Sequence, residues 1–316
     1  MLEQLLKEKD ENGNTPLHLA TQRTKTSLGG TKEVANILLT YIRDHTKDQM
    51  KYLTKKNSFG WTPFSGAVSG GDLEMVEDML QELTETERRV VVNQPDFSNT
   101  FPLHLAAKYG HVGVFKLLLD NKAELNQRGR DFKTALDIAI VYEHRMIIQT
   151  IIEADEWMEA FQIPSTSDRG DLETPLRKLI RSLPDMAEKF LDRCCEELPP
   201  DDKDSSVAGL VKMNADFIED THKYLVLKNK KKEKNLFCHR DRQRLEQDSG
   251  GIFDNYQVDI NNHPMVIMAD ERKEDLLQHP LCIAIILKKW SVYRWYYYFQ
   301  LAFYLFFLTE FDPIAS

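Results

Sequence analysis

The chain has 316 residues, of which 42% are hydrophobic and 29% charged, and its net charge is −9. This length is sufficient for a sizeable core and for two domains. The acidic balance argues against nucleic acid as the main partner, because binding phosphate groups requires a basic face. The opening "MLEQLLKEKDENG" has no apolar run of about seven residues, so we expect no secretory signal.

Four cysteines are present, and their spacing indicates the redox compartment. Cys194 and Cys195 are adjacent, whereas Cys238 and Cys282 lie far from them and from each other. This spacing predicts neither a disulfide framework nor a zinc site of the C-x-x-C type. The pattern is typical of a reduced, cytosolic chain.

Helix pairs are predicted along the first half of the chain. Each pair begins with a version of one short sequence motif, called the phrase below. The versions are "NTPLHLA" (14–20), "GWTPFSGAV" (60–68), "TFPLHLAA" (100–107) and "KTALDIA" (133–139). Threonine caps a helix, and proline suits its first position, where a missing N–H costs nothing. The signature residues are Thr15, Pro16, His18, Thr62, Pro63, Pro102, His104 and Thr134. The phrase resembles the T-P-L-H-x-A signature of ankyrin repeats.

The spacing of the phrase indicates insertions. Its prolines or their equivalents stand at positions 16, 63, 102 and 135, giving steps of 47, 39 and 33 residues. The standard period is about 33 residues, so the first two units are longer than expected. Residues 1–156 are therefore predicted to form about four ankyrin repeats, two of them with insertions that form loops on one face. Since no polar cap precedes the first unit, we expect further repeats before it.

The histidines of the phrase allow two interpretations. His18 and His104 could be metal ligands, or each could form hydrogen bonds within its repeat. No other ligand is spaced to complete a metal set, so the sequence favours the structural role. No metal and no cofactor are expected.

Residues 157–262 are predicted to form a helical linker with a short β element. "ETPLRKLIRSLPDMAEKFLDRCCEEL" (173–198) has the pattern of two short helices, in the shape of a decayed repeat, and "HKYLVL" (222–227) is typical of a strand. "KNKKKEK" (228–234) is either a solvated loop or a contact for anionic lipid head groups or polyphosphates. Its lysines are Lys228, Lys230, Lys231, Lys232 and Lys234.

The end of the chain is aromatic. A helix is predicted to start at Pro280 within the segment 263–290, followed by "SVYRWYYYFQLAFYLFFLTEF". From Trp295 to Leu308 only Gln300 is strongly polar, over a helical length of about 21 Å. A bilayer requires about 20 residues, so residues 291–316 are predicted to be the opening part of a first transmembrane helix, truncated. The alternative is a buried helix of a soluble domain.

The run "LLQHPLCIAIILKKW" is similar to the helix that leads into the first membrane span of transient receptor potential channels of the ankyrin (TRPA) subfamily. Its matching residues are Leu276, Leu277, His279, Pro280, Cys282, Lys289 and Trp290. "TPLRKLIRSLPDMAEKFLDRC" resembles the preceding linker of the same subfamily. The fold implied is mostly α: an ankyrin-repeat solenoid, a helical linker with a short β element, and the start of a transmembrane helix.

The resemblance implies a subunit of a homotetrameric, calcium-permeable, non-selective cation channel of the plasma membrane, with residues 1–290 in the cytosol. It also implies candidate sites of modification by electrophiles at Cys194 and Lys289. Thr174 and Met186 stand where sensitive members have cysteine, which argues against electrophile sensing by this chain. From the residues alone, Cys282 has the better electrostatic setting for a thiolate, two residues after a helix start, unless its neighbours bury it.

Two other classes of protein are weighed against the channel. A soluble ankyrin adaptor would bind a protein partner on its concave face. An enzyme is disfavoured because the sequence has no Gly-rich phosphate loop, no nucleophile elbow and no metal-spaced His/Glu set. Further hydrophobic spans and a pore loop in the same transcript would favour the channel over the adaptor.

Overall fold

The computed structural model describes residues 2–21, 30–46, 48–129, 132–166, 172–197, 211–218, 225–227, 256–258 and 263–311. These residues are mainly helical, with three small antiparallel strand pairs. The predicted fold class, a mostly α solenoid followed by a helical linker with a short β element, is confirmed. A short helix, α1 (Leu2–Leu5), precedes the first repeat.

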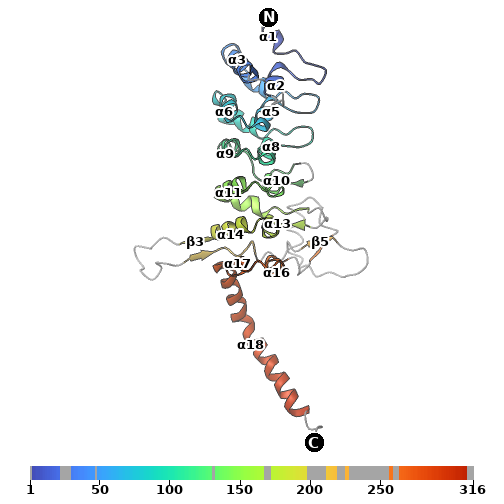
Figure 1. Cartoon of the computed structure of the whole chain (residues 1–316), viewed down its shortest axis with the longest axis vertical. Helices are drawn as coiled ribbons and strands as arrows, with labels where there is room; N and C mark the ends of the chain where they lie inside the picture. Colours follow the sequence, from blue (N-terminus) through green and yellow to red (C-terminus); the bar gives the residue numbers. More distant parts are fainter. Residues whose placement is uncertain are drawn as a thin grey trace, which may run out of the picture.

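The four predicted repeats form four helix pairs. They are α2 (Pro16–Thr21) with α3 (Gly30–His45), α5 (Pro63–Gly70) with α6 (Leu73–Gln81), α8 (Pro102–Tyr109) with α9 (Val112–Asp120), and α10 (Ala135–Val141) with α11 (Arg145–Glu153). The first helices of the pairs contact one another in chain order, and so do the second helices. The result is two parallel columns, seen from the side in Figure 1.

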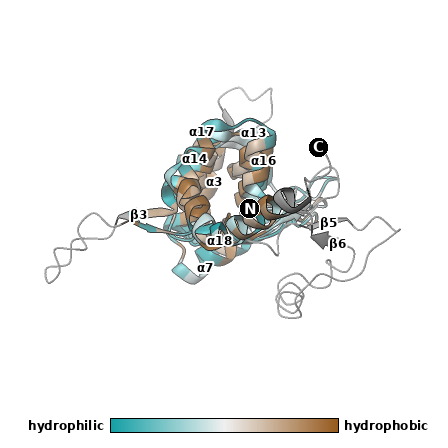
Figure 2. Ribbon diagram, turned by 90° about the horizontal axis from the view of Figure 1, so that it is seen from below, coloured by the Kyte–Doolittle hydropathy of each residue, from teal (hydrophilic) through white to brown (hydrophobic). Residues whose placement is uncertain are grey.

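The core lies between the two columns, because each helix turns its apolar stripe toward the other column. Fully buried side chains come from the first helices (Phe64 and Leu136) and from the second helices (Phe115 and Ile147). Figure 2, seen along the stack, shows hydrophobic residues on the helices of both columns. Helical repeats that cannot bury their apolar face alone do so by stacking.

The recurring phrase caps α5 and α10 with threonine, as expected, whereas α8 has Phe101 at its N-cap and no side-chain cap. The Thr62 hydroxyl accepts the backbone N–H of Ser65, and Pro63 occupies the first position of α5. Thr134 and Asp137 form the same reciprocal arrangement at α10. A side chain that satisfies an otherwise unpaired N–H at a helix start contributes about 1 kcal/mol.

The histidines of the phrase connect successive repeats. The N–H of Thr15 donates to Nδ1 of His18 over 3.1 Å, so Nε2 carries the proton and donates to the carbonyl of Trp61 at 3.0 Å. His104 repeats the pattern, accepting from the N–H of Phe101 and donating to Gln127. The bond of His18 reaches the next repeat, so its structural role extends beyond its own unit.

The insertions that follow the second helices of the first two repeats differ from the prediction of loops, whereas most of the insertion at 23–32 lies outside the described residues. Each contains a short helix, α4 (Gln49–Leu53) and α7 (Glu85–Val92), and the two helices contact each other. Thr84 and Glu87 cap α7 reciprocally, and its last residue, Val92, is fully buried, as is Leu53. Because these apolar side chains reach the core, the inserted segments fold onto the stack. Figure 2 shows α7 at the edge of the molecule.

The helix stack continues through the predicted linker. The decayed repeat forms α13 (Pro175–Ser182) and α14 (Pro184–Arg193), which contact α10 and α11 as a fifth pair. The short helices α16 (Pro264–Asp270) and α17 (Glu274–Leu277) contact α13 and α14 in turn. The two columns therefore extend to six layers before the last helix begins (Figure 1).

Smaller elements flank the lower layers. Helix α12 (Trp157–Gln162) follows the fourth repeat, and its Trp157 and Phe161 pack with Phe190 and Phe217 in one aromatic cluster. The strand pairs are β1 (Ser165–Thr166) with β2 (Leu172–Glu173), β3 (Cys195–Glu197) with β4 (Val211–Met213), and β5 (Leu225–Leu227) with β6 (Tyr256–Val258). The predicted strand at 222–227 corresponds to β5.

The last helix, α18 (Pro280–Phe311), has 32 residues and projects from the end of the stack (Figure 1). It starts at Pro280, as the sequence predicted, and continues without a break past position 290. Among the residues that the structure describes, no helix has both the length and the apolar character needed to cross a membrane.

Candidate functional site

The junction between the stack and α18 contains the residues of the H-P-x-C motif. His279 is buried, and its Nδ1 accepts the backbone N–H of Leu281 at 3.2 Å, which caps the start of α18. Nε2 therefore carries the ring proton and donates to Oδ1 of Asp192, 3.1 Å away on α14. Pro280 is the first residue of the helix, where its missing N–H costs nothing. His279 therefore caps α18 and links it to α14, in the fifth layer of the stack.

Only the first turns of α18 are anchored. Leu281, Cys282 and Ile285 are at most 3% exposed, whereas Ile286 is already 48% exposed. From Trp290 to Phe306 the large side chains are 40 to 70% exposed, and they are Trp290, Val292, Tyr293, Trp295, Tyr296, Tyr297, Tyr298, Phe299, Leu301, Phe303, Tyr304, Leu305 and Phe306. The aromatic residues of α18 from Trp290 to Phe306 are therefore not sheltered in the core of the stack, which was the alternative to a membrane-facing helix.

The two cysteines singled out from the sequence are both buried at this junction. Burial raises the pKa of Cys194 to about 12, the neighbouring Cys195 adds to the rise, and Arg193 opposes it. Burial also raises the pKa of Cys282 to about 11, so the helix start does not produce a thiolate there. Both thiols are protonated at neutral pH, and a protonated thiol is a poor nucleophile.

The remaining candidate residues are spread over the chain. Lys289 lies on the exposed part of α18. Lys228, Lys230, Lys231, Lys232 and Lys234 lie outside the residues that the structure describes. No group of three or more His, Cys, Asp or Glu side chains is arranged for a metal ion in the described part of the chain.

A buried polar network between the fourth repeat and the linker was not predicted. Oδ1 of Asp137, which is fully buried, accepts from the hydroxyl of Ser165 at 2.7 Å and from Nζ of Lys178 at 2.8 Å. Its Oδ2 accepts from the N–H and the hydroxyl of Thr134. The available signal was Asp137 itself, an acid at the position where the other repeats have His18, Ser65 and His104.

The architecture described so far is that of an ankyrin-repeat protein, and comparison with known families agrees. The family described as ankyrin repeats (3 copies) matches residues 33–129 and 67–159. These matched residues correspond to the upper and middle layers of the stack. Ankyrin repeats and TRPA channels are non-enzymatic families, in agreement with the prediction that the chain is no enzyme.

One relative extends the similarity over nearly the whole chain, beyond the repeats. The chain is 29% identical over 320 residues to a transient receptor potential cation channel subfamily A member 1 homologue of Caenorhabditis elegans, covering 97% of this chain. It is 29% identical over 154 residues to the human subfamily A member 1 protein. The alignments span 24% and 12% of these relatives' lengths, respectively. The resemblance to a TRPA-type N-terminal ankyrin fragment is thus confirmed.

A different group of relatives matches only about a quarter of the chain. Human ankyrin repeat domain-containing protein 13C is 36% identical over 84 residues, which is 27% of this chain and 13% of that protein. The Danio rerio protein of the same name is 35% identical over 88 residues. This similarity covers too little of the chain to include both the repeats and the junction with α18.

Proposed function

We propose that this chain forms the cytosolic and pre-pore part of a subunit of a calcium-permeable, non-selective cation channel of the TRPA type. In this role it couples a sensory stimulus to gating. The stack and its lower layers would act as a lever on α18, so a change of shape in either part would bias the gate. The observation that carries the proposal is the His279 junction, where a six-layer stack is fastened to a projecting aromatic helix.

The membrane role of α18 is supported by its chemistry. Aromatic side chains at least 40% exposed would cost free energy in water and are typical of the layer where a helix enters lipid. Lys288, Lys289 and Arg294 lie near the start of this segment, and positive charges favour the cytosolic side. We therefore propose that residues 291–316 begin a transmembrane helix at the plasma membrane, with residues 1–290 in the cytosol.

Partners follow from the same proposal. The full-length protein would be a homotetramer in contact with membrane lipid, and a protein partner would bind the concave face of the repeats. The lysines from Lys228 to Lys234 would contact phosphoinositide or polyphosphate. Thr174 and Met186 replace cysteines of electrophile-sensitive members, and Cys194 is buried, so a thermal or other non-electrophile stimulus fits better.

A soluble adaptor is the rival function. The similarity to ankyrin repeat domain-containing protein 13C supports the adaptor, but it covers only about a quarter of the chain. The similarity to TRPA relatives extends over the linker and α18, which an adaptor does not require. The channel therefore explains more of this sequence than the adaptor does.

The proposal can be tested by patch clamp on cells that express the complete transcript. A stimulus-dependent, calcium-permeable cation current is expected. The variant Asp192→Asn, which weakens the bond to His279, should lower the stimulus-evoked current by about fivefold. The control is Asp185→Asn, on the same helix, whose exposed carboxylate pairs with Arg145 at 3.0 Å. A complete transcript without a pore region, or cells without such a current, would contradict the channel assignment.

A further inference from the structure

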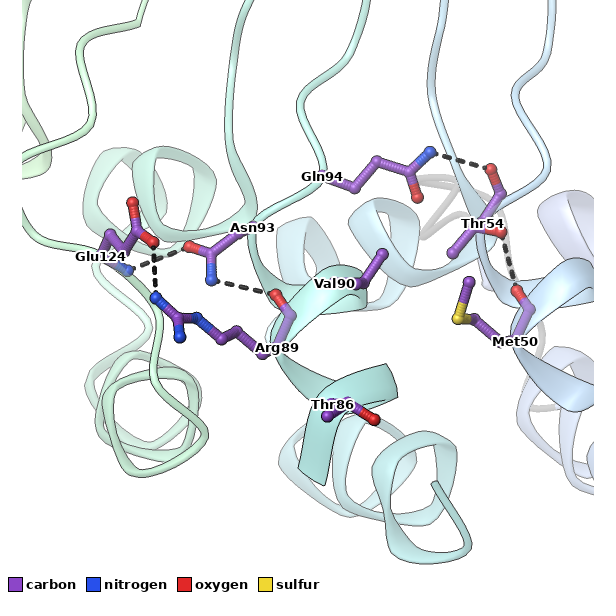
Figure 3. Close-up of a pocket in the computed structure, with 8 residues that line it drawn as sticks. All are labelled: Met50, Thr54, Thr86, Arg89, Val90, Asn93, Gln94 and Glu124. Carbon is purple, nitrogen blue, oxygen red and sulfur yellow. Dashed lines mark hydrogen bonds and ion pairs between the residues drawn. The ribbon is translucent and has the colours of Figure 1, made fainter. Parts of the chain in front are cut away.

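The two inserted helices build a pocket that repeats of standard length would not have. Helices α4 and α7 follow the second helices of the first two repeats and line an open pocket of about 540 Å³ (Figure 3). Met50 and Thr54 line it from α4 and the residue after it, while Thr86 and Val90 line it from α7. Pockets of this volume commonly hold a small ligand or the anchoring side chains of a peptide.

The floor of the pocket is held in place by two amides just after α7. Nδ2 of Asn93 donates to the carbonyls of Arg89 and Lys122, and its Oδ1 accepts the N–H of Glu124, each at 3.0 Å. Nε2 of Gln94 donates to the carbonyl of Thr54 at 3.2 Å. These bonds join α7 to α4 on one side and to the third repeat on the other (Figure 3). The pocket is therefore preformed, which lowers the entropic cost of binding.

The wall of the pocket is apolar. Val90, on α7, is 51% exposed, and Met50, on α4, is partly buried against the core. Figure 3 shows the side chains of Val90 and Met50 facing the same space. An aliphatic side chain placed between them would remove apolar surface from water, which favours binding.

The pocket continues into an acidic groove along the stack. A second hollow of about 750 Å³ shares Arg89 and Glu124 with the first and extends to the ends of α9 and α11. Three cationic side chains line it, against six carboxylates, which belong to Glu85, Asp120, Glu124, Glu153, Asp155 and Glu156. Helix C-termini add negative partial charge, and α9 ends at Asp120 and α11 at Glu153.

Most of these carboxylates are available to a partner. Among the ion pairs of the described residues, only Arg89–Glu124 at 3.3 Å belongs to the groove, and both of its side chains are exposed by more than a third. Such an exposed pair contributes little stability, so a ligand can replace it at low cost. An acidic peptide or a nucleic acid would meet repulsion along this surface.

We propose that the groove formed by α4, α7 and the ends of α9 and α11 binds an extended basic peptide segment of a partner protein. One aliphatic side chain of the segment enters the pocket between Met50 and Val90. The following Lys or Arg residues lie over the carboxylates, from Glu124 to Glu156. The charge of the groove selects this occupant, and the apolar pocket sets the register of the peptide on the stack.

The test is fluorescence anisotropy with the full chain in nonionic detergent. The probe is a fluorescein-labelled peptide with one leucine followed by four arginines. Two comparison peptides carry either four glutamates in place of the arginines or serine in place of the leucine. We expect the leucine–arginine peptide to bind at least about tenfold more tightly than either comparison peptide, and binding to weaken as salt rises.

Variants of the groove separate specific binding from general attraction to an acidic protein. Glu153→Lys with Glu156→Lys should weaken the leucine–arginine peptide by about tenfold or more. The matched control, Glu77→Lys with Glu188→Lys, makes the same change of charge at exposed positions outside the groove and should change affinity less than about twofold. Equal losses in the two double variants, or tight binding of the glutamate peptide, would overturn the proposal.

The pocket is tested separately from the charges. Val90→Ser, at a half-exposed helix position, should bring the affinity of the leucine peptide down to that of the serine peptide and leave the serine peptide unaffected. Circular dichroism of each variant checks that the stack is folded. If Val90→Ser weakens both peptides equally in a folded chain, the leucine does not occupy this pocket and the proposal fails.

Discussion

At the scale of single residues, burial determines the protonation of the side chains that join the layers. His104 is 2% exposed, and burial lowers its pKa to about 4, against the weaker opposing effect of its bond to the carbonyl of Gln127. Burial lowers the pKa of His18 as well. The neutral ring is required, since Nδ1 must accept an N–H while Nε2 donates to the next unit. A charged imidazole would lose the accepted bond.

Acid should therefore weaken the stack through His104. Its pKa is lower in the folded chain than the ordinary 6.5, so its contribution is fully present above about pH 6.5 and is lost as pH falls toward 4. We expect a loss of roughly 2 kcal/mol in the free energy of unfolding between pH 7 and 4.5 from this residue. Urea unfolding at the two pH values measures it. The variant His104→Gln should show a smaller pH dependence, and an unchanged dependence would contradict the assignment.

The buried cysteines should resist alkylation. Since burial raises the pKa of Cys194 to about 12 and that of Cys282 to about 11, little thiolate is present at neutral pH. Iodoacetamide should modify both residues more than about a hundredfold more slowly in the folded chain than in the urea-unfolded chain. Mass spectrometry of timed samples reports the rates residue by residue. Fast, selective modification of Cys194 at pH 7 would show this prediction to be wrong.

At the scale of the elements, one buried ion pair joins the fourth repeat to the fifth helix pair. Asp137 on α10 and Lys178 on α13 are 2.8 Å apart, with side chains 0% and 12% exposed, and β1 contributes the hydroxyl of Ser165. A buried pair adds little net stability, because desolvating both charges offsets their attraction, but removing one partner leaves a charge uncompensated. We therefore expect the pair to favour the pairing of α10 with α13 at this layer over other pairings.

Removing the buried cation should be costly. Lys178→Met leaves the carboxylate of Asp137 without its charge partner, and we expect a loss of about 3 kcal/mol in the free energy of unfolding. The double variant Asp137→Asn with Lys178→Met should recover part of that loss. Arg145→Met is the control, since its ion pair with Asp185 is about half exposed and should cost less than about 1 kcal/mol. Equal losses for Lys178→Met and Arg145→Met would contradict a special role for the buried pair.

At the scale of the whole molecule, the helix stack and a projecting helix meet at a small anchored junction. The anchor consists of His279 and the buried residues of the first turns of α18, and beyond them the helix has no cover among the described residues. Exposed aromatic surface of this extent favours association with lipid or with other apolar surfaces. The behaviour of the chain in solution should therefore depend on residues 291–316.

Deleting residues 291–316 should change the solubility of the chain. We expect the whole chain to require detergent and to float with phosphatidylcholine vesicles in a density gradient, whereas the deletion variant should disperse in buffer and remain with the soluble fraction. The deletion leaves His279 and the buried first turns of α18 in place. If the whole chain disperses freely in water and does not float with the vesicles, the membrane proposal is contradicted.

Much of the fold was predictable because its signals are local. The caps at Thr62 and Thr134 act within one turn, so the phrase marks each first helix directly. The helix start at Pro280 follows from the same kind of signal. The helices of the insertions were missed although Thr84 and Glu87 form a readable capping pair, since the extra length of the first two units was attributed to loops.

The sequence by itself determined the repeat type, the helix starts and the aromatic character of α18, because each depends on residues within a few positions of one another. Tertiary structure alone decided that the linker joins the stack, that His279 meets Asp192 across 87 positions, and that Cys194 and Cys282 are buried. The reason is physical: burial, and the choice of partner for a polar group, depend on which helices pack together. That packing is settled by apolar surface summed over many layers, which no short pattern contains.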